Sequence, residues 1–271
     1  MRNFTLPESV RLVVEFFDMF DYPVTLYEVV KYAPSQLSFT QAHELLVAHG
    51  DIVCHDGYYG KKESKAQVVK RLRRQRLFED KIRKVASTLR LISWCPSIVN
   101  VYLSNSMSFG TVHEDSDIDV FIVTKPRQLW SARLWAMLAT MLCGTRVTAT
   151  SKDKVCLSFF ATTDARLSDA FESSEDYYMY FWEKSLISLQ DPTIAGFISY
   201  KSHPTAHFLL SWYGFGEVLY KSAQRFLMRP QKLEMARSGG THVIMNETMI
   251  KLHERDLRSD YNHQLQKRLY A

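Results

Sequence analysis

The sequence of 271 residues predicts an α+β protein built from four parts. Residues 1–62 have the pattern of a small helical module that ends in a hairpin, and residues 63–96 that of a basic amphipathic connecting helix. Residues 97–165 predict an α/β domain with a small mixed sheet, and residues 166–271 a helical region. Three observations support this division: helical spacing of apolar residues in the first two parts, short apolar strands beside an acidic segment, and aromatic-rich helical patterns after it.

Three short helices are predicted in the N-terminal module. Apolar residues recur at helical spacing over residues 8–20. Capping boxes, in which Ser or Thr is followed three residues later by Glu or Gln, start at Thr25 and Ser38. They predict two further helices, over residues 26–32 and 39–49.

A hairpin follows these helices. Residues 51–59 predict two short strands around a turn at Asp56 and Gly57. Three helices followed by a hairpin is the order of a winged helix-turn-helix module. The third helix, residues 39–49, contains no Lys or Arg to contact phosphates or guanines, so nucleic acid is not indicated as its partner. We favour a contact between domains or with another protein over DNA binding.

One long helix is predicted next, and Ser64 and Gln67 mark its first turn. Its apolar residues form a single stripe: Val68, Leu72, Phe78, Ile82, Val85, Leu89 and Ile92. The opposite face is basic: Lys65, Lys70, Arg71, Arg73, Arg74, Arg76, Lys81, Arg83 and Lys84. Such a face can follow a phosphate backbone, but the solvated side of a helix packed on the next domain has the same composition. We favour the solvated helix.

Strands and helices alternate in the next part of the chain. Residues 98–103 and 120–124 predict strands separated by a segment that contains Gly110. Residues 129–143 predict an apolar helix, and residues 155–160 a third strand. Together they predict the small mixed sheet.

Helices are predicted for most of the C-terminal region, over residues 177–189, 206–227 and 242–270. The first contains an aromatic cluster: Tyr177, Tyr178, Tyr180, Phe181 and Trp182. Such a cluster can stack a nucleobase, although burial against neighbouring helices is its usual role. His203 and His207 have the spacing of metal ligands, but no third ligand is evident, so zinc is not expected there.

Composition limits the class of partner and the compartment. The net charge of +5 permits an anionic ligand such as a nucleotide without requiring one. The cysteines Cys54, Cys95, Cys143 and Cys156 form no Cys-x-x-Cys pair, so we expect reduced thiols in a cytoplasmic protein. The most apolar stretch, residues 134–143, has about half the length that spans a bilayer, so no membrane partner is expected.

A pair of carboxylates stands at the start of the second predicted strand. Side chains alternate along a strand, so Asp117 and Asp119 project from one face while Ile118 and Val120 point into the core. Two adjacent carboxylates repel each other unless a cation lies between them. Mg²⁺, which prefers oxygen ligands and substrate phosphates, is the natural occupant. A pair of such ions would neutralise a triphosphate and activate an attacking hydroxyl.

A turn that can hold a phosphate precedes this motif. Ser106 follows the strand that ends at Leu103, where backbone N–H groups at the start of the next segment can receive a phosphate. Ten residues separate Ser106 from Asp117. Residues 101–124 resemble the signature of the DNA polymerase beta-like nucleotidyltransferase superfamily, a Gly-Ser turn followed by Asp-x-Asp on a strand. Residues 16–23 and the order of the predicted elements also resemble those of prokaryotic proteins that join a winged helix to this domain.

The resemblance implies a nucleotide site and a metal site. Asp117 and Asp119 would hold one or two Mg²⁺ ions as the catalytic carboxylates, and Ser106 would contact the terminal phosphates of a nucleoside triphosphate. We assign four residues to the nucleotide site: Asn105, Ser106, Gly110 and Ser116. The implied reaction moves a nucleoside monophosphate from the triphosphate to an acceptor hydroxyl on a small molecule, a protein or an RNA.

Two positions differ from the family pattern. Asn105 stands where the family turn has Gly, although Asn tolerates a left-handed backbone. Active members place a third carboxylate on a later strand, whereas residues 155–160 offer none. Ser158 has the facing position, and Asp153 and Asp164 flank the strand as alternative acids. The competing hypothesis is therefore a catalytically degenerate protein that senses a nucleotide or acts as a protein- or DNA-binding regulator.

Overall fold

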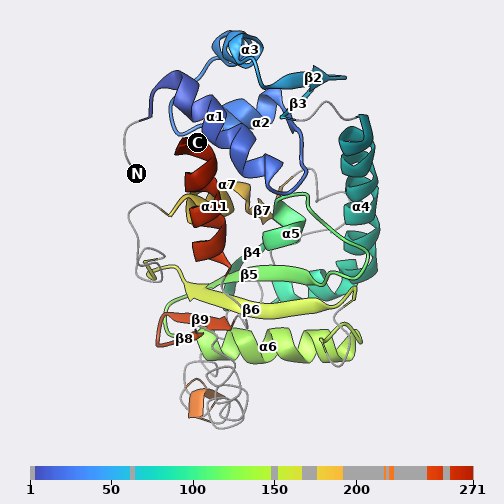
Figure 1. Ribbon diagram of the computed structural model, residues 1–271. Helices are drawn as coiled ribbons and strands as arrows, with labels where there is room; N and C mark the ends of the chain where they lie inside the picture. The colour runs from blue at the N-terminus through green and yellow to red at the C-terminus, as the bar shows by residue number, and fades with distance from the viewer. Residues whose placement is uncertain are drawn as a thin grey trace.

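Two sheets organise the fold, and the predicted α+β class is confirmed (Figure 1). The computed structural model describes residues 4–61, 65–147, 152–166, 176–191, 217, 220–222, 243–252 and 257–270. A helical unit with a small sheet lies at one end of the molecule, and a larger mixed sheet lies at the other. One long helix runs along the side of both.

The N-terminal unit has its helices where the capping boxes place them. They are α1 (Leu6–Asp18), α2 (Leu26–Tyr32) and α3 (Phe39–Ala48). Each begins at a complete capping box, at Thr5, Thr25 and Ser38. The first of these boxes was not predicted, and it starts α1 two residues before the predicted helix. Local hydrogen bonds therefore fix the helix starts.

A small antiparallel sheet completes this unit. Its strands are β1 (Val24–Thr25), β2 (Val53–His55) and β3 (Tyr58–Gly60), in the order β1-β3-β2. The predicted turn between β2 and β3 is confirmed, with positive φ at Asp56 (51°) and Gly57 (81°). Two consecutive residues with positive φ match the twist of a tight hairpin.

The connecting helix α4 (Lys65–Ser93) buries most of its apolar stripe, but the predicted solvated basic face is wrong in part. Arg74 is only 7% exposed, and Lys81 is fully buried. Other members form ion pairs with acidic side chains: Lys70–Asp21, Arg71–Glu28, Arg73–Glu114, Arg83–Glu79 and Lys84–Asp153. Because these acids neutralise much of the face, it is poorly suited to a phosphate backbone.

The larger sheet has the strand order β7-β4-β5-β6-β9-β8 within the described residues. Its strands are β4 (Ile98–Leu103), β5 (Ile118–Thr124), β6 (Val155–Thr162), β7 (Ile187–Ser188), β8 (Val243–Met245) and β9 (Met249–Leu252). β5 and β6 run parallel, with helix α6 (Leu129–Leu142) between them in sequence, and the other neighbouring pairs are antiparallel. β4, β5 and β6 are the three strands predicted from the sequence.

The prediction of a helical C-terminal region is wrong in part. α7 (Tyr177–Ser185) and α11 (Arg258–Tyr270) are helical as predicted, but β7, β8 and β9 join the larger sheet. The side-chain oxygen of Asn246 accepts hydrogen bonds from the N–H groups of Thr248 and Met249, at 2.9 and 2.7 Å, and so turns the chain between β8 and β9. A short apolar segment can fit the periodicity of a helix or that of a strand. Here β9 is a strand because it pairs with the edge of β6.

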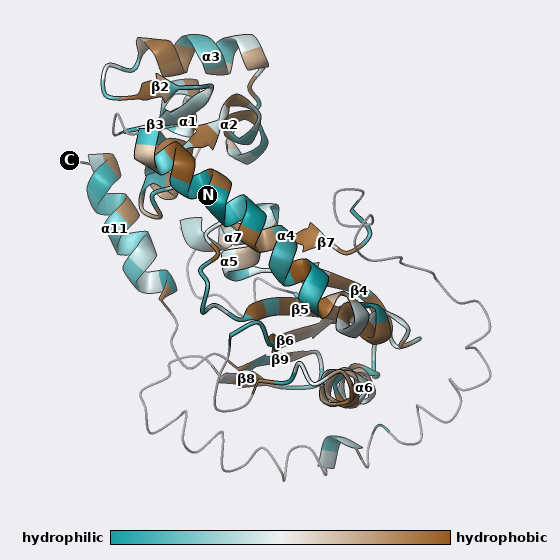
Figure 2. Cartoon of the chain, turned by 90° about the vertical axis from the view of Figure 1, so that its right-hand side faces the viewer, coloured by the Kyte–Doolittle hydropathy of each residue, from teal (hydrophilic) through white to brown (hydrophobic). Residues whose placement is uncertain are grey.

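Both faces of the larger sheet are covered. α4 and α6 pack on one face, where β5 buries three residues: Ile118, Val120 and Ile122. On the other face, Trp182 of α7 packs against Phe121, and the rings of Phe16 and Phe181 stack at a centroid distance of 3.9 Å. In Figure 2 the central strands are largely brown, while α4 and α11 carry much teal. The N-terminal unit is thus joined to the sheet by an aromatic core.

Two further features bear on the sequence predictions. No described helix combines the length and the apolar character that crossing a bilayer requires. All four cysteines are free.

Candidate metal and nucleotide site

Asp117 and Asp119 lie at the start of β5 on the same face of the sheet, as predicted. Ile118 and Val120 are fully buried on the opposite face, against α4 and α6. The two carboxylates lie on the side that carries α7 and the short helix α5 (Asn105–Ser108). The alternation of side chains along β5 therefore brings both acids to one place.

Cys156 is the third member of this group. β6 runs parallel to β5 with Cys156 opposite Asp119. One carboxylate oxygen each from Asp117 and Asp119 and the Sγ of Cys156 all lie within 4.8 Å of one another. Among the described residues, this is the one cluster of three acidic, His or Cys ligand atoms that could surround a metal ion.

The two acids proposed from the sequence as a third carboxylate lie elsewhere. Lys81 and Lys84 each bind one oxygen of Asp153, at 2.6 Å. Asp164 lies in the turn that follows β6, at the end of the strand away from Cys156. Ser158 is buried on β6, where it hydrogen-bonds Cys156. Cys156 was missed because the strand pairing that aligns it with Asp119 has no signal in the local sequence.

Burial shapes the charge of the site. It raises the pKa of Asp119 to about 6, and the adjacent Asp117 carboxylate adds to the increase. Burial also raises the pKa of Asp117. The pKa of the Cys156 thiol is raised by burial and by both carboxylates, so the thiol stays protonated at neutral pH.

The chemistry of these donors fits a hard divalent cation. Two carboxylates that repel each other gain from sharing Mg²⁺ or Mn²⁺, which prefer oxygen ligands. Structural zinc sites usually combine several Cys or His ligands, whereas this cluster has one Cys and no His. Asp117 and Asp119 are therefore the residues that would hold such an ion, with Cys156 beside it.

Asn105 supports the carboxylates. Its φ of 52° lies in the left-handed region, which Asn tolerates better than most residues. Its side-chain oxygen accepts a hydrogen bond from the indole N–H of Trp182 at 3.0 Å, and its amide hydrogen-bonds Asp119. The side chain is thus held between Trp182 and Asp119.

The other residues assigned to the nucleotide site divide into two groups. Ser106 lines a cavity, as Asn105 does. Gly110 (φ 69°) packs against Tyr22, where an added Cβ would lie 2.7 Å from a ring carbon. Ser116 closes a turn, since its hydroxyl donates to the carbonyl of His113 at 2.8 Å. The structure brings Asn105 to Asp119, places Ser106 in the cavity wall, which neither carboxylate lines, and gives Gly110 and Ser116 local structural roles.

The cavity beside Ser106 has a volume of about 580 Å³. This volume lies within the usual range for small-molecule and cofactor sites. The wall of the cavity includes the acidic residue Asp21, which pairs with Lys70, and Arg258 of the same wall pairs with Asp176. The basic residues of the wall are Lys70, Arg74, Lys251 and Arg258. Its aromatic side includes Phe20, Tyr178 and Tyr261, and the last two rings stack with an interplanar angle of 8°. The cavity thus offers both positive charge and flat apolar surface.

No family model, curated protein or solved structure matches this chain. The geometry of the site therefore carries the functional argument. The aromatic cluster expected in α7 is divided: Tyr177 and Phe181 are buried in the core, whereas Tyr178 and the buried Trp182 border the cavity. His203 and His207 lie outside the described residues, as does most of the predicted helix 206–227. Lys251 and Arg258 were not predicted, because they reach the cavity only through β9 and α11.

Proposed function

We propose that this protein is a Mg²⁺-dependent nucleotidyltransferase, which moves a nucleoside monophosphate from a nucleoside triphosphate to an acceptor hydroxyl. One observation supports the proposal: Asp119, which is paired with Asp117, hydrogen-bonds Asn105, and Asn105 lies in the wall of a cavity with basic residues. A triphosphate needs both a divalent cation and further positive charge. This arrangement offers both.

Each part of the cavity has a role in this proposal. When bound, Mg²⁺ would supply charge neutralisation of the phosphates. Ser106 donates its hydroxyl to a terminal phosphate oxygen, and the basic side chains of the cavity wall balance the remaining negative charge. A carboxylate oxygen of Asp117 or Asp119 accepts the proton of the acceptor hydroxyl. The aromatic side of the cavity, with Tyr261, stacks the base.

The N-terminal unit supports a scaffold role in this proposal. Its order of three helices and a hairpin is that of a winged helix. Its contacts are within the chain: the hydroxyl of Tyr180 in α7 donates to the carbonyl of Tyr32 at 2.9 Å, and Phe16 stacks on Phe181. We propose that this winged-helix-like unit fixes α7 and the cavity wall, with DNA binding as the alternative.

A second candidate function is nucleotide binding without transfer. It is favoured by Cys156, whose neutral thiol lies opposite Asp119, where another carboxylate would complete a two-metal site. Two carboxylates supply enough charged ligands for one divalent ion more easily than for two ions. Such a protein would act as a nucleotide sensor.

Incubation with each labelled triphosphate, Mg²⁺ and cell extract tests the proposal. The variant Asp117→Asn together with Asp119→Asn removes both charges at nearly constant shape. The matched control is Asp115→Asn, because the Asp115 side chain is 90% exposed in the same acidic segment. Label transfer that is lost in the double variant and kept in the control supports transfer. Binding of the triphosphate with neither label transfer nor pyrophosphate release supports the sensor, and absence of binding rejects both.

A further inference from the structure

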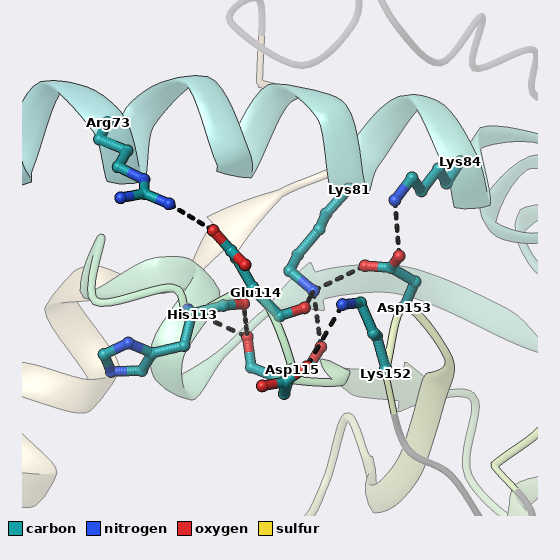
Figure 3. A network of polar contacts seen from close by, with 9 residues as sticks. Arg73, Lys81, Lys84, His113, Glu114, Asp115, Lys152 and Asp153 are labelled. Atoms are coloured by element: carbon teal, nitrogen blue, oxygen red, sulfur yellow. Dashed lines mark hydrogen bonds and ion pairs between the residues drawn. The ribbon is translucent and has the colours of Figure 1, made fainter.

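Lys81 is a fully buried charge in the middle of α4 (Figure 3). An ammonium group has three N–H donors, and all three have acceptors here. Lys81 Nζ donates to the carbonyl of Ser116 at 2.7 Å, to the carbonyl of Glu114 at 3.1 Å and to Oδ1 of Asp153 at 2.6 Å. A basic residue assigned from the sequence to a solvated face is thus the centre of an internal polar network.

Two of these acceptors belong to the segment that leads into the metal site. The Ser116 carbonyl is part of the planar peptide unit that ends at Cα of Asp117, so holding that carbonyl restricts the position of the aspartate. The same carbonyl accepts a hydrogen bond from the N–H of Asp153 at 3.3 Å. On the other side of Asp117, the N–H of Ile118 donates to the carbonyl of Lys154 at 2.8 Å.

Asp153 keeps Lys81 in place. Its second oxygen binds Lys84 at 2.6 Å, and its backbone has a φ of 56°, in the left-handed region. Lys84 contributes the same charge from the same helix, but its side chain is 56% exposed, and among the described residues it binds Asp153 alone. The two lysines therefore differ in one respect that matters here, the contact with the carbonyls of Glu114 and Ser116.

We infer that Lys81 is a positioning residue, which fixes the segment before Asp117 so that the two carboxylates meet a divalent cation together. The inference rests on the metal site of the proposed function. The three donors of Lys81 are all taken up by acceptors of the protein. Lys81 acts through the backbone of Ser116, as residues behind metal ligands orient those ligands elsewhere.

Mn²⁺ binding by the whole chain tests this role, because the free ion gives a paramagnetic resonance signal that disappears on binding. Lys81→Met keeps an unbranched side chain of similar length and removes the three donors. We expect it to weaken Mn²⁺ binding by about tenfold or more, as loss of a residue behind the ligands typically does. Lys84→Met is the matched control and should leave the Mn²⁺ affinity unchanged.

A second control separates positioning from support of the fold. Val85 is fully buried one turn along α4, packs in the apolar core and takes no part in the hydrogen bonds of Lys81. Val85→Ala should lower the midpoint of thermal unfolding and leave Mn²⁺ affinity unchanged. A Lys81→Met protein that behaves like Val85→Ala overturns the inference. Should Lys81→Met fail to fold, Asp153→Ser decides: weaker Mn²⁺ binding supports the inference, and unchanged binding overturns it.

These outcomes are distinct from those of the proposed function. Wild-type protein that shows no Mn²⁺ binding dependent on Asp117 and Asp119 overturns both. Mn²⁺ binding that depends on Lys81, without any nucleotide transfer or nucleotide binding, supports the positioning role and rejects the proposed function alone.

Discussion

The indole N–H of Trp182 donates to the side-chain oxygen of Asn105 at 3.0 Å, and the amide of Asn105 in turn hydrogen-bonds Asp119. A buried aromatic residue of α7 is thereby linked to the candidate metal site through one polar side chain. The link explains why Asn is useful in a turn that also accepts Gly. Asn105 combines a left-handed backbone with a side chain that reaches the carboxylate of Asp119.

Substitutions at Asn105 should separate these two functions. Asn105→Gly keeps the φ of 52° without strain, whereas Asn105→Ala keeps a Cβ in the left-handed region without the polar side chain that makes Asn tolerant of it, at a cost of about 1 to 2 kcal/mol relative to Gly. Both lose the contact with Asp119, so both should bind Mn²⁺ more weakly than the wild type. Urea unfolding should rank Ala below Gly in stability. Equal stabilities would show that backbone strain at this turn is negligible.

Gly110 should prove important for folding and not for nucleotide binding. Gly110→Ala forces a side chain into positive φ and towards the ring of Tyr22, so it should lower the free energy of unfolding by at least about 1 kcal/mol. Nucleotide affinity of the folded variant should stay at the wild-type value, as measured by calorimetry. A large loss of nucleotide affinity with an unchanged free energy of unfolding would show instead that Gly110 contributes to nucleotide binding.

Asp119 should make the metal-free protein less stable at neutral pH. Because its pKa is raised from 3.8 to about 6, the folded state holds more protons than the unfolded state between these values. Stability due to this group therefore falls as pH rises from about 4 to about 6, and the loss is complete above that range. Asp119→Asn should stabilise the metal-free protein by about 2 kcal/mol at pH 7.

Urea unfolding of both proteins at pH 4.5 and pH 7, with a chelator present, measures this difference. The gain from Asp119→Asn should be smaller at the lower pH, because the wild-type carboxyl is then largely protonated. An equal gain at both values would argue against the raised pKa. With metal present the order should reverse, since Mn²⁺ at a hundred times its Kd stabilises the wild type by about 2.7 kcal/mol.

Cys156→Asp should add the missing carboxylate. The new acid lies opposite Asp119, so without a cation it should lower stability through like-charge repulsion. Mn²⁺ should restore that stability and bind about tenfold more tightly than in the wild type, since another charged ligand raises affinity for a hard cation. Cys156→Ser is the control for loss of the thiol. Thermal unfolding with and without Mn²⁺ measures the effect, and equal metal affinity in the two variants would contradict it.

Tyr261 should contribute to nucleotide binding by stacking. Tyr261→Leu keeps apolar bulk but removes the flat ring, so nucleotide affinity should fall by about 1 to 3 kcal/mol, the range for stacking a base on an aromatic side chain. Tyr270 offers a matched control on the same helix, because its side chain is 64% exposed and lies outside the cavity lining. Fluorescence titration with a labelled nucleotide compares Tyr261→Leu with Tyr270→Leu. The same loss in both would exclude stacking.

Local patterns in the sequence were enough to predict much of the fold. Capping boxes place the starts of α2 and α3 because their hydrogen bonds join residues only three apart. The turn at Asp56 and Gly57 and the strands β4, β5 and β6 follow from equally local signals. By contrast, β8 and β9 were expected to be helical. Their apolar segments are too short to distinguish a helical from a strand periodicity, and only pairing with a neighbouring strand makes them strands.

The sequence by itself determined that Asp117 and Asp119 share a face, since alternation along a strand is a property of the backbone. Only the tertiary structure decided what surrounds them. Cys156 comes opposite Asp119 because β6 pairs with β5 in one register, and Lys81 reaches the Ser116 carbonyl because α4 packs across the same sheet. Strand pairing and helix packing join residues far apart in the chain, and buried polar groups take their charge from those neighbours.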